Sequence, residues 1–337
     1  MIKKPIIVSN DAKINIFIVG YKNIGESIVI EIEDSKLQTP ICGVIDCYET
    51  KNLNWALNFL NSKNVNKLQF LLWSHPDDDH SKGLDKILRK FKFNIDTLCV
   101  SDGLSITEID KSIKHNNHDN GNFDYMADIF ECIKEISECI EDKFISVNHS
   151  TRELKIPFLF SNGESIDFTI KPFAPLSTIC LNEKIKLFDN IINKENHSIS
   201  KNKISIGFII TLGERKICFT GDMINEVLNY KSYKNNLKEL FEGVDVFKIP
   251  HHGGKSSDKF IDILPKIIEI ASVTRYQTTN PDLDIIKRYK QRSNKVLCTS
   301  KLDYSQNVKD IGVIKISIPF DSSKCITTHT DENACQL

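Results

Sequence analysis

The feature that most constrains this chain is the stretch LLWSHPDDDHSKGLD, which covers residues 71–85. An apolar run is followed by five potential metal ligands within six residues, namely His75, Asp77, Asp78, Asp79 and His80. Three adjacent carboxylates repel one another unless positive charge lies close to them. Imidazole nitrogens and carboxylate oxygens are ligands that suit Zn²⁺ or Mn²⁺. The charge must therefore be balanced either by solvent counter-ions or by a bound metal.

The flanking residues place this stretch in a loop between a strand and a helix. Residues 68–74 form a continuous apolar run that predicts a buried strand. Residues 83–91 carry apolar side chains at helical spacing. Loops at strand ends are where α/β folds place their chemistry. The alternative is that the aspartates cap the helix and face its positive end, although a cap needs only one aspartate.

The rest of the chain alternates short apolar runs with helical patterns, and it predicts a single α/β sandwich. Helices are expected at 54–62, 83–91 and 282–292. Strands are expected at 14–20, 27–33, 41–47, 68–74, 164–173, 245–250, 295–300 and 312–318, with a hairpin over 205–221. The region near 111–145 predicts a helical insertion. We expect one domain over 1–321 and a polar, frayed tail over 322–337.

Composition excludes several functional classes. The formal net charge is −1, so the chain as a whole has no strong attraction for nucleic acid or anionic membranes. No uncharged apolar stretch reaches about 18 residues, which argues against a membrane span. The ten cysteines form no CxxC pair, as is typical of free thiols in a reducing compartment. We expect a soluble cytoplasmic protein without a membrane partner.

Two later segments also end apolar strands with aspartate or histidine. The segment CFTGDM (218–223) contains Asp222, and FKIPHHGG (247–254) contains His251 and His252. Either segment alone is a weak signal, because an HHG sequence is more often a surface loop. Together with residues 75–80, they give three strand ends that each deliver Asp or His. Such a set is what a site for two metal ions needs.

In this order, HPDDDH, FTGD and KIPHHGG resemble the motifs of metallo-β-lactamase fold hydrolases, and specifically the branch that contains the hydrolase domain of ComEC-type DNA-uptake proteins. FIVGYKNIGESIVIEI is similar to the opening hairpin of that family, with Glu26 where aspartate is usual. GVIDC resembles its next strand and places Asp46 at the usual acidic position. SIGFIITLGERKICFTGD, which begins at Ser205, resembles its later hairpin. The resemblance implies a four-layer αββα sandwich and covers most of the chain.

The resemblance also implies a ligand set for two divalent ions, Zn²⁺ or Mn²⁺. The implied ligands are His75, Asp77, Asp79, His80, Asp222 and His252. In this scheme His75 and Asp77 hold one ion, Asp222 bridges the two ions, and the other ion is held by Asp79, His80 and His252. His252 is preferred over His251 because the ligand histidine of the family usually precedes glycine directly. A further ligand is expected between residues 80 and 222, with His197 chosen and Asn196 and His149 as alternatives.

Other positions receive supporting roles from the resemblance. His251 is expected to contact substrate or a metal ligand, and it is a catalytic candidate together with Asp79. Asp46 is expected to orient the histidine loop, whereas Asp78 is expected to face solvent or cap the helix. Asn280 replaces the histidine that often precedes proline late in this family. That replacement removes the usual proton donor from this position.

The implied activity is hydrolysis by a hydroxide that bridges two metals, oriented by Asp79. Asp77, in place of the more common histidine, makes the site more anionic and favours phosphodiester substrates, including DNA. The basic segment 287–295, with Tyr289 for stacking, would contact nucleic acid, unless it is only a solvated helix face. The alternatives are a hydrolase of a small ester, lactone or signalling nucleotide, and a non-catalytic regulatory module on the same fold.

Overall fold

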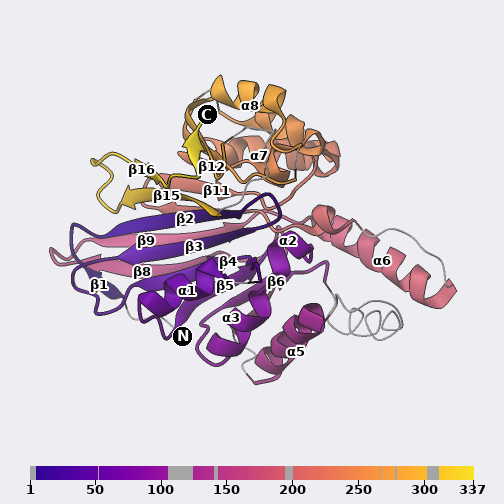
Figure 1. Cartoon of the computed structure of the whole chain (residues 1–337), viewed down its shortest axis with the longest axis horizontal. Helices are drawn as coiled ribbons and strands as arrows, with labels where there is room; N and C mark the ends of the chain where they lie inside the picture. The colour runs from indigo at the N-terminus through magenta and orange to yellow at the C-terminus, as the bar shows by residue number, and fades with distance from the viewer. Residues whose placement is uncertain are drawn as a thin grey trace.

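The computed structural model of the chain describes residues 5–51, 53–104, 124–139, 143–193, 200–265, 267–277, 279–301 and 311–337. Two large β-sheets pack face to face, and helices cover the outer face of each sheet (Figure 1). This arrangement is the four-layer αββα sandwich that the sequence predicts. The described helices include none that is long and apolar enough to cross a bilayer.

The first sheet contains most of the amino-terminal strands. Its spatial order is β16 (Thr327–Thr330), β15 (Ile311–Pro319), β2 (Lys13–Tyr21), β3 (Glu26–Glu33), β4 (Ile41–Ile45), β5 (Leu68–Trp73), β6 (Leu98–Ser101) and β7 (Phe144–Val147). Strands β4 to β7 are mutually parallel, so their carboxyl ends lie along the same edge. The loop that contains His75, Asp77, Asp78, Asp79 and His80 begins at that edge, directly after β5.

The second sheet is formed mainly by the carboxyl-terminal half. Its spatial order is β1 (Ile6–Val8), β8 (Leu154–Phe160), β9 (Ser165–Pro172), β10 (Phe208–Leu212), β11 (Arg215–Phe219), β12 (Val246–Lys248), β13 (Ile268–Val273), β14 (Ser293–Cys298) and β17 (Cys335–Gln336). Strands β11 to β14 are parallel to one another. Strands β10 and β11 form the expected hairpin.

The central core lies between the two sheets and follows from strand periodicity. In β2, Ile14, Ile16 and Ile18 face the opposite sheet, whereas Phe17 faces the outer helices. Successive side chains of a strand point to opposite faces, so a continuous apolar run supplies both layers. This explains why the buried strands contain apolar runs without alternation, such as residues 16–19 of β2.

Helices complete both outer layers. The first sheet is covered by α1 (Trp55–Ser62), α3 (Leu84–Phe91) and α5 (Asp124–Cys139), with the short α2 (Asp78–Ser81) at its edge. The second is covered by α7 (Lys231–Phe241), α8 (Leu283–Lys290) and the 3₁₀ segments η3 (Asn225–Asn229) and η5 (Lys255–Ile263). The helix α6 (Ser177–Asn193) extends away from the sandwich (Figure 1).

Two regions test the sequence-based boundaries. Helix α5 falls in the predicted insertion near 111–145 and packs on α3, while residues 105–123 lie outside the described residues. The expectation of a frayed tail from residue 322 is wrong, because β16 pairs with β15 and β17 pairs with β14. Helices α6 and α7 are absent from the sequence-based expectations. In α7, a polar composition hides the narrow apolar face that the helix buries with Tyr233, Leu237 and Phe241.

Candidate metal centre

The candidate site lies where strand ends of the two sheets meet. The segment after β5 carries residues 74–80, the segment after β11 carries Asp222, and the 3₁₀ turn η4 (Pro250–Gly253) after β12 carries His251 and His252. All three segments follow parallel strands, whose carboxyl ends share one edge of each sheet. Ligand sites of open α/β sheets form outside such ends.

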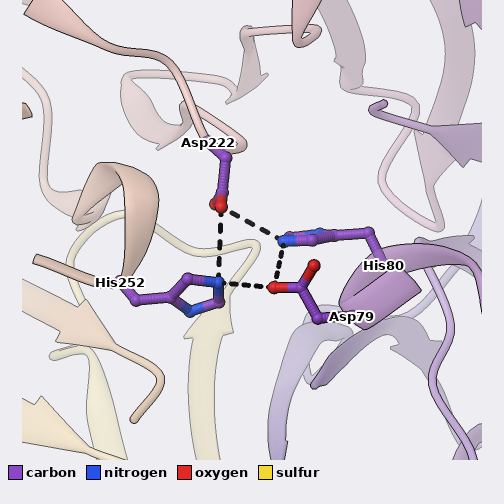
Figure 2. Close-up of side chains that lie close together, drawn as sticks. All are labelled: Asp79, His80, Asp222 and His252. Atoms are coloured by element: carbon purple, nitrogen blue, oxygen red, sulfur yellow. Dashed lines mark hydrogen bonds and ion pairs between the residues drawn. The ribbon is translucent and has the colours of Figure 1, made fainter. Parts of the chain in front are cut away.

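Four side chains converge at this edge from segments far apart in the sequence (Figure 2). His252 Nε2 lies 3.0 Å from Asp79 Oδ2 and 3.3 Å from Asp222 Oδ2. His80 Nε2 lies 3.5 Å from Asp79 Oδ2 and 3.4 Å from Asp222 Oδ1. All four residues are buried. We call Asp79, His80, Asp222 and His252 the four-donor cluster.

The spacing of the four-donor cluster fits one divalent ion. A tetrahedral ion about 2.0–2.1 Å from each donor separates neighbouring donors by about 3.3 Å. The four separations between a histidine nitrogen and an aspartate oxygen, which involve both oxygens of Asp222, are 3.0–3.5 Å, and one donor atom from each residue lies within 4.8 Å of the others. His80 Nε2 and Asp222 Oδ1 are buried and have no hydrogen-bond partner in the described part of the chain. Buried polar atoms are nearly always partnered, so both atoms are suited to bind an ion.

The charge of the cluster is balanced internally by its histidines. Burial lowers the pKa of His252, but the Asp222 charge and the hydrogen bonds that the ring donates to Asp222 and Asp79 outweigh it and raise the pKa to about 9. Burial raises the pKa of Asp222, yet His252 and His80 hold it well below its usual range. A divalent ion would therefore compete with protons for the nitrogens of these rings, because a histidine must be deprotonated at the nitrogen that binds a metal.

Asp46 and Ser74 fix the orientation of His80. Asp46 Oδ2 lies 2.8 Å from His80 Nδ1, and Asp46 also accepts from the backbone N of Ser74 at 2.7 Å and its Oγ at 2.6 Å. An Nδ1–H bond to this carboxylate leaves His80 Nε2 free to bind an ion. Asp46 has a positive φ of 53°, which is uncommon for a residue other than glycine. The backbone is thus held in an unfavourable conformation where it supports the cluster.

Replacing Asp46 with asparagine is expected to weaken divalent-ion binding about 10- to 100-fold, because His80 loses the carboxylate that orients it. The measurement is the dissociation constant of Zn²⁺ or Mn²⁺ by calorimetric titration. Asp34→Asn is a matched control, since Asp34 also accepts from a serine backbone N and hydroxyl, those of Ser9. An equal loss of affinity in both variants would contradict the assigned role of Asp46.

A buried polar network orients His252. Its Nδ1 lies 2.8 Å from Thr274 Oγ1, which in turn donates to Glu26 Oε2. Lys248 Nζ donates to the same Glu26 oxygen at 2.9 Å. The Tyr276 ring stacks on the His252 ring, with centroids 4.7 Å apart and planes inclined by 16°. The ring of His252 is therefore held by packing on one face and by a hydrogen bond at its edge.

A glycine allows Asp222 to approach the cluster. Gly221 has a positive φ of 50°, and a Cβ at this position would lie 2.3 Å from Ser205 Oγ. Ser205 Oγ also accepts a hydrogen bond from the Asp222 backbone N at 2.9 Å. The glycine in the TGD motif is thus required both for backbone conformation and for space.

His75 and Asp77 form a second, adjoining pair. His75 Nε2 lies 3.4 Å from Asp77 Oδ2, and the His75 and His80 ring centroids are 4.3 Å apart. Asp77 occupies the cap position of α2, but its side chain caps no helix N–H. Instead, burial raises the pKa of Asp77 while His75 and Lys201 hold it well below its usual range. The helix-cap alternative is therefore disfavoured for this residue.

His251 lies beside the four-donor cluster rather than in it. Its Nδ1 is 2.6 Å from Ser256 Oγ, and its Nε2 is 3.2 Å from Asn202 Nδ2. Burial lowers the pKa of His251, which keeps its ring neutral at pH 7. His251 and His252 both have positive φ, at 48° and 51°, so the tight turn before Gly253 directs the two rings differently.

Several sequence-based candidates lie elsewhere. His149 is exposed, and its Nδ1 accepts from the Ser177 backbone N at 3.3 Å, away from the cluster. The preferred candidate His197 and the alternative Asn196 lie outside the described residues. Asp78 is exposed as expected, and its Oδ1 accepts from Tyr125 Oη at 2.5 Å.

The expectation that Tyr289 stacks on nucleic-acid bases is wrong. Its side chain is fully buried and packs on Phe247, with ring centroids 6.2 Å apart. The neighbouring Lys287 pairs with Asp284 and Arg288 pairs with Asp262. The helix α8 is therefore an amphipathic surface helix whose cations are largely compensated, as the solvated-face alternative requires.

Sequence reasoning missed several residues that support the site, among them Ser74, Lys201, Asn202, Lys248, Thr274 and Tyr276. Lys248 had a visible signal, because it interrupts the apolar run VFKIP directly before the two histidines. A lysine inside a buried strand needs a buried partner. Lys201 and Asn202 carried no such signal, since polar residues in a loop are ordinary.

No family model and no curated protein matches this chain. Among solved structures, the metallo-β-lactamase fold protein YhfI from Bacillus subtilis is 10% identical, with a TM-score of 0.40 over 84% of this chain and 96% of that one. A diphosphatase of the PhnP family is 11% identical, with a TM-score of 0.32 over 72% and 71%. The MIM-2 metallo-β-lactamase is 12% identical, with a TM-score of 0.33 over 72% and 75%. The roles proposed for individual residues therefore rest on the distances and contacts within this chain.

Proposed function

We propose that this chain is a metal-dependent hydrolase that cleaves phosphodiesters. The observation that carries the proposal is the four-donor cluster, whose separations of 3.0–3.5 Å suit one divalent ion. Its nitrogen and oxygen donors suit Zn²⁺ or Mn²⁺. An ion that keeps a coordination position for water beyond these four donors would supply Lewis acidity and make that water more acidic. We assign a second, adjoining position to His75 and Asp77.

The side chains of the site have separate roles in the proposed reaction. Asp79 is expected to accept a hydrogen bond from the attacking water and orient it, in addition to facing the ion. His251 is half-buried at the margin of the cluster, where its Nδ1 lies beside Ser256 and its Nε2 accepts from Asn202, and it is expected to contact substrate there. Burial of the four donors excludes bulk water, which strengthens electrostatic interactions with substrate.

The three carboxylates at the site, those of Asp77, Asp79 and Asp222, make it anionic and favour ions that bind the oxygens of phosphodiesters, with DNA as the first candidate. A small-molecule substrate, such as a signalling nucleotide, an ester or a lactone, is the second candidate. It is favoured by the buried Tyr289 and the paired cations of α8, which leave that helix poorly suited to hold a nucleic-acid strand. The buried free thiols fit a reducing compartment such as the cytoplasm.

Hydrolysis of a chromogenic phosphodiester in the presence of Mn²⁺ or Zn²⁺ tests the proposal. We expect Asp79→Asn to lower kcat/KM at least about a hundredfold, since it removes both an ion ligand and the water acceptor. Asp78→Asn is the matched control, because Asp78 is adjacent but exposed. The proposal fails if purified protein binds no divalent ion, or if the two variants hydrolyse the reporter at equal rates.

Parallel assays with single-stranded DNA, double-stranded DNA, a cyclic dinucleotide, a carboxyl ester and a lactone separate the substrate classes. Cleavage of DNA that falls steeply as salt rises would support phosphate contacts along a strand. Cleavage of the small phosphodiesters alone would favour the second candidate. Hydrolysis of the ester or lactone without any phosphodiester would overturn the assigned substrate class while leaving the metal centre intact.

A further inference from the structure

The adjoining position formed by His75 and Asp77 differs from the four-donor cluster in how its charge is balanced. His75 is fully buried, and its Nε2 has no hydrogen-bond partner within the described ranges. That nitrogen lies 3.4 Å from Asp77 Oδ2, so the two donors face a common point. Among the described residues, the groupings of three or more potential ligands do not include this pair.

A lysine occupies the other side of the Asp77 carboxylate. Lys201 Nζ lies 3.1 Å from Asp77 Oδ1, while Asp77 Oδ2 faces His75. Lys201 begins the 3₁₀ turn η2 (Lys201–Ile204), which is followed directly by Ser205. Asn202 contacts His251, and Ser205 Oγ accepts from the Asp222 backbone N. The position of the ammonium is therefore set by a turn that is anchored at the site.

An ammonium group and a divalent ion would compete for the carboxylate of Asp77. An ion bound between His75 and Asp77 would repel a cation held on the same carboxylate. The side chains of Lys201 and Asp77 are 45% and 30% exposed, so solvent weakens but does not remove this repulsion. Two ligands also make a weaker site than four, because fewer bonds replace the hydration of the ion.

We propose that the Lys201 ammonium is the resident cation of the His75–Asp77 position, so that a second divalent ion binds there only by displacing it. This inference rests on the proposed metal centre and refines it. The chain would then hold one ion tightly in the four-donor cluster. The lysine would supply positive charge on the side where a two-ion enzyme uses its second ion.

Metal titration of Lys201→Met tests the inference, because methionine keeps an unbranched side chain one atom shorter than that of lysine and removes its charge. We expect the full-length protein to bind one Zn²⁺ tightly and a second at least about tenfold more weakly. In Lys201→Met the second dissociation constant is expected to fall about tenfold, with the first unchanged. Bound metal is counted by equilibrium dialysis and elemental analysis, and Mn²⁺ spin coupling reports whether two ions are adjacent.

Two further variants serve as controls. Lys203→Met removes a cation from the same turn, but Lys203 pairs with Glu226 and lines a separate hollow of about 480 Å³ beside α6. Lys203→Met is expected to leave both Zn²⁺ dissociation constants unchanged. Lys201→Arg keeps the charge and is expected to keep the second ion weak.

The outcomes distinguish this inference from the function on which it rests. Two ions bound with equal affinity by the unaltered chain would overturn it, and that result is expected if His197 completes the second position. An unchanged second constant in Lys201→Met would overturn it as well. Both results would leave the hydrolase proposal standing. If no variant binds any ion, the metal centre itself is refuted together with this inference.

Discussion

His252→Ala is expected to weaken divalent-ion binding at least about a hundredfold and to lower phosphodiester hydrolysis in parallel. The reason is that His252 Nε2 lies within 3.0 Å of Asp79 Oδ2 and 3.3 Å of Asp222 Oδ2, at the centre of the cluster. Removing an ion ligand should cost more than removing a residue that only orients one, which typically costs 10- to 100-fold. Calorimetric titration with Zn²⁺ and steady-state kinetics at saturating metal are the measurements.

His251→Ala provides the comparison, because it changes the adjacent residue in the same turn. His251 contacts Ser256 and Asn202 and lies outside the four-donor cluster. We expect it to bind the first ion almost normally and to lose turnover instead. If His251→Ala lost the ion while His252→Ala kept it, the choice between the two histidines would be reversed.

The sequence could predict which segments form the centre because each motif lies directly after a buried strand. The apolar run of β5 stops at Ser74, that of β11 stops before Asp222, and that of β12 ends before the two histidines. A strand buried on both faces is recognisable from continuous apolar sequence, and parallel strands bring their carboxyl ends to one edge. Local pattern and sheet topology together therefore place the four donors.

Most of the supporting network could not be predicted, because its contacts join residues that are far apart in the sequence. Lys248 interrupts an apolar run, but nothing in the sequence identifies Glu26 as its partner. Glu26 and Lys248 are separated by 222 positions, and Lys201 meets Asp77 from a loop whose preceding residues the structure does not describe. The tail was misjudged for a related reason. Its short strands are polar, so only their pairing with β14 and β15 shows that they are ordered.

The buried pair of Glu26 and Lys248 offers the largest expected effect on stability. Both side chains are about 2% exposed, and Lys248 Nζ lies 2.9 Å from Glu26 Oε2. Burial raises the pKa of Glu26, but the Lys248 charge, with those of His80 and His252, outweighs it and lowers the pKa to about 2. The same carboxylate holds Thr274 against His252, so this pair connects the stability of the fold to the shape of the centre.

Lys248→Met is expected to lower the free energy of unfolding by about 3–5 kcal/mol, because Glu26 is left charged and buried without its partner. Glu26→Gln should lower the free energy of unfolding by a comparable amount, since it leaves the Lys248 ammonium buried without a charged partner. The double variant should cost at least about 2 kcal/mol less than the sum of the two single changes, because the unpaired charge is gone. Urea denaturation of metal-free protein gives all three values. Additive losses would show that the two side chains act independently.

The effect of pH gives the same pair a second test. The folded pKa of Glu26, at about 2, lies below its ordinary value of 4.5, so its ionised form is favoured by folding. The contribution of the pair to stability should be complete above pH 4.5 and should be lost as pH falls toward about 2. The stability difference between the unaltered chain and Lys248→Met should therefore shrink on acidification. A difference that stays constant over this range would mean that lost packing, rather than an unpaired charge, destabilises the variant.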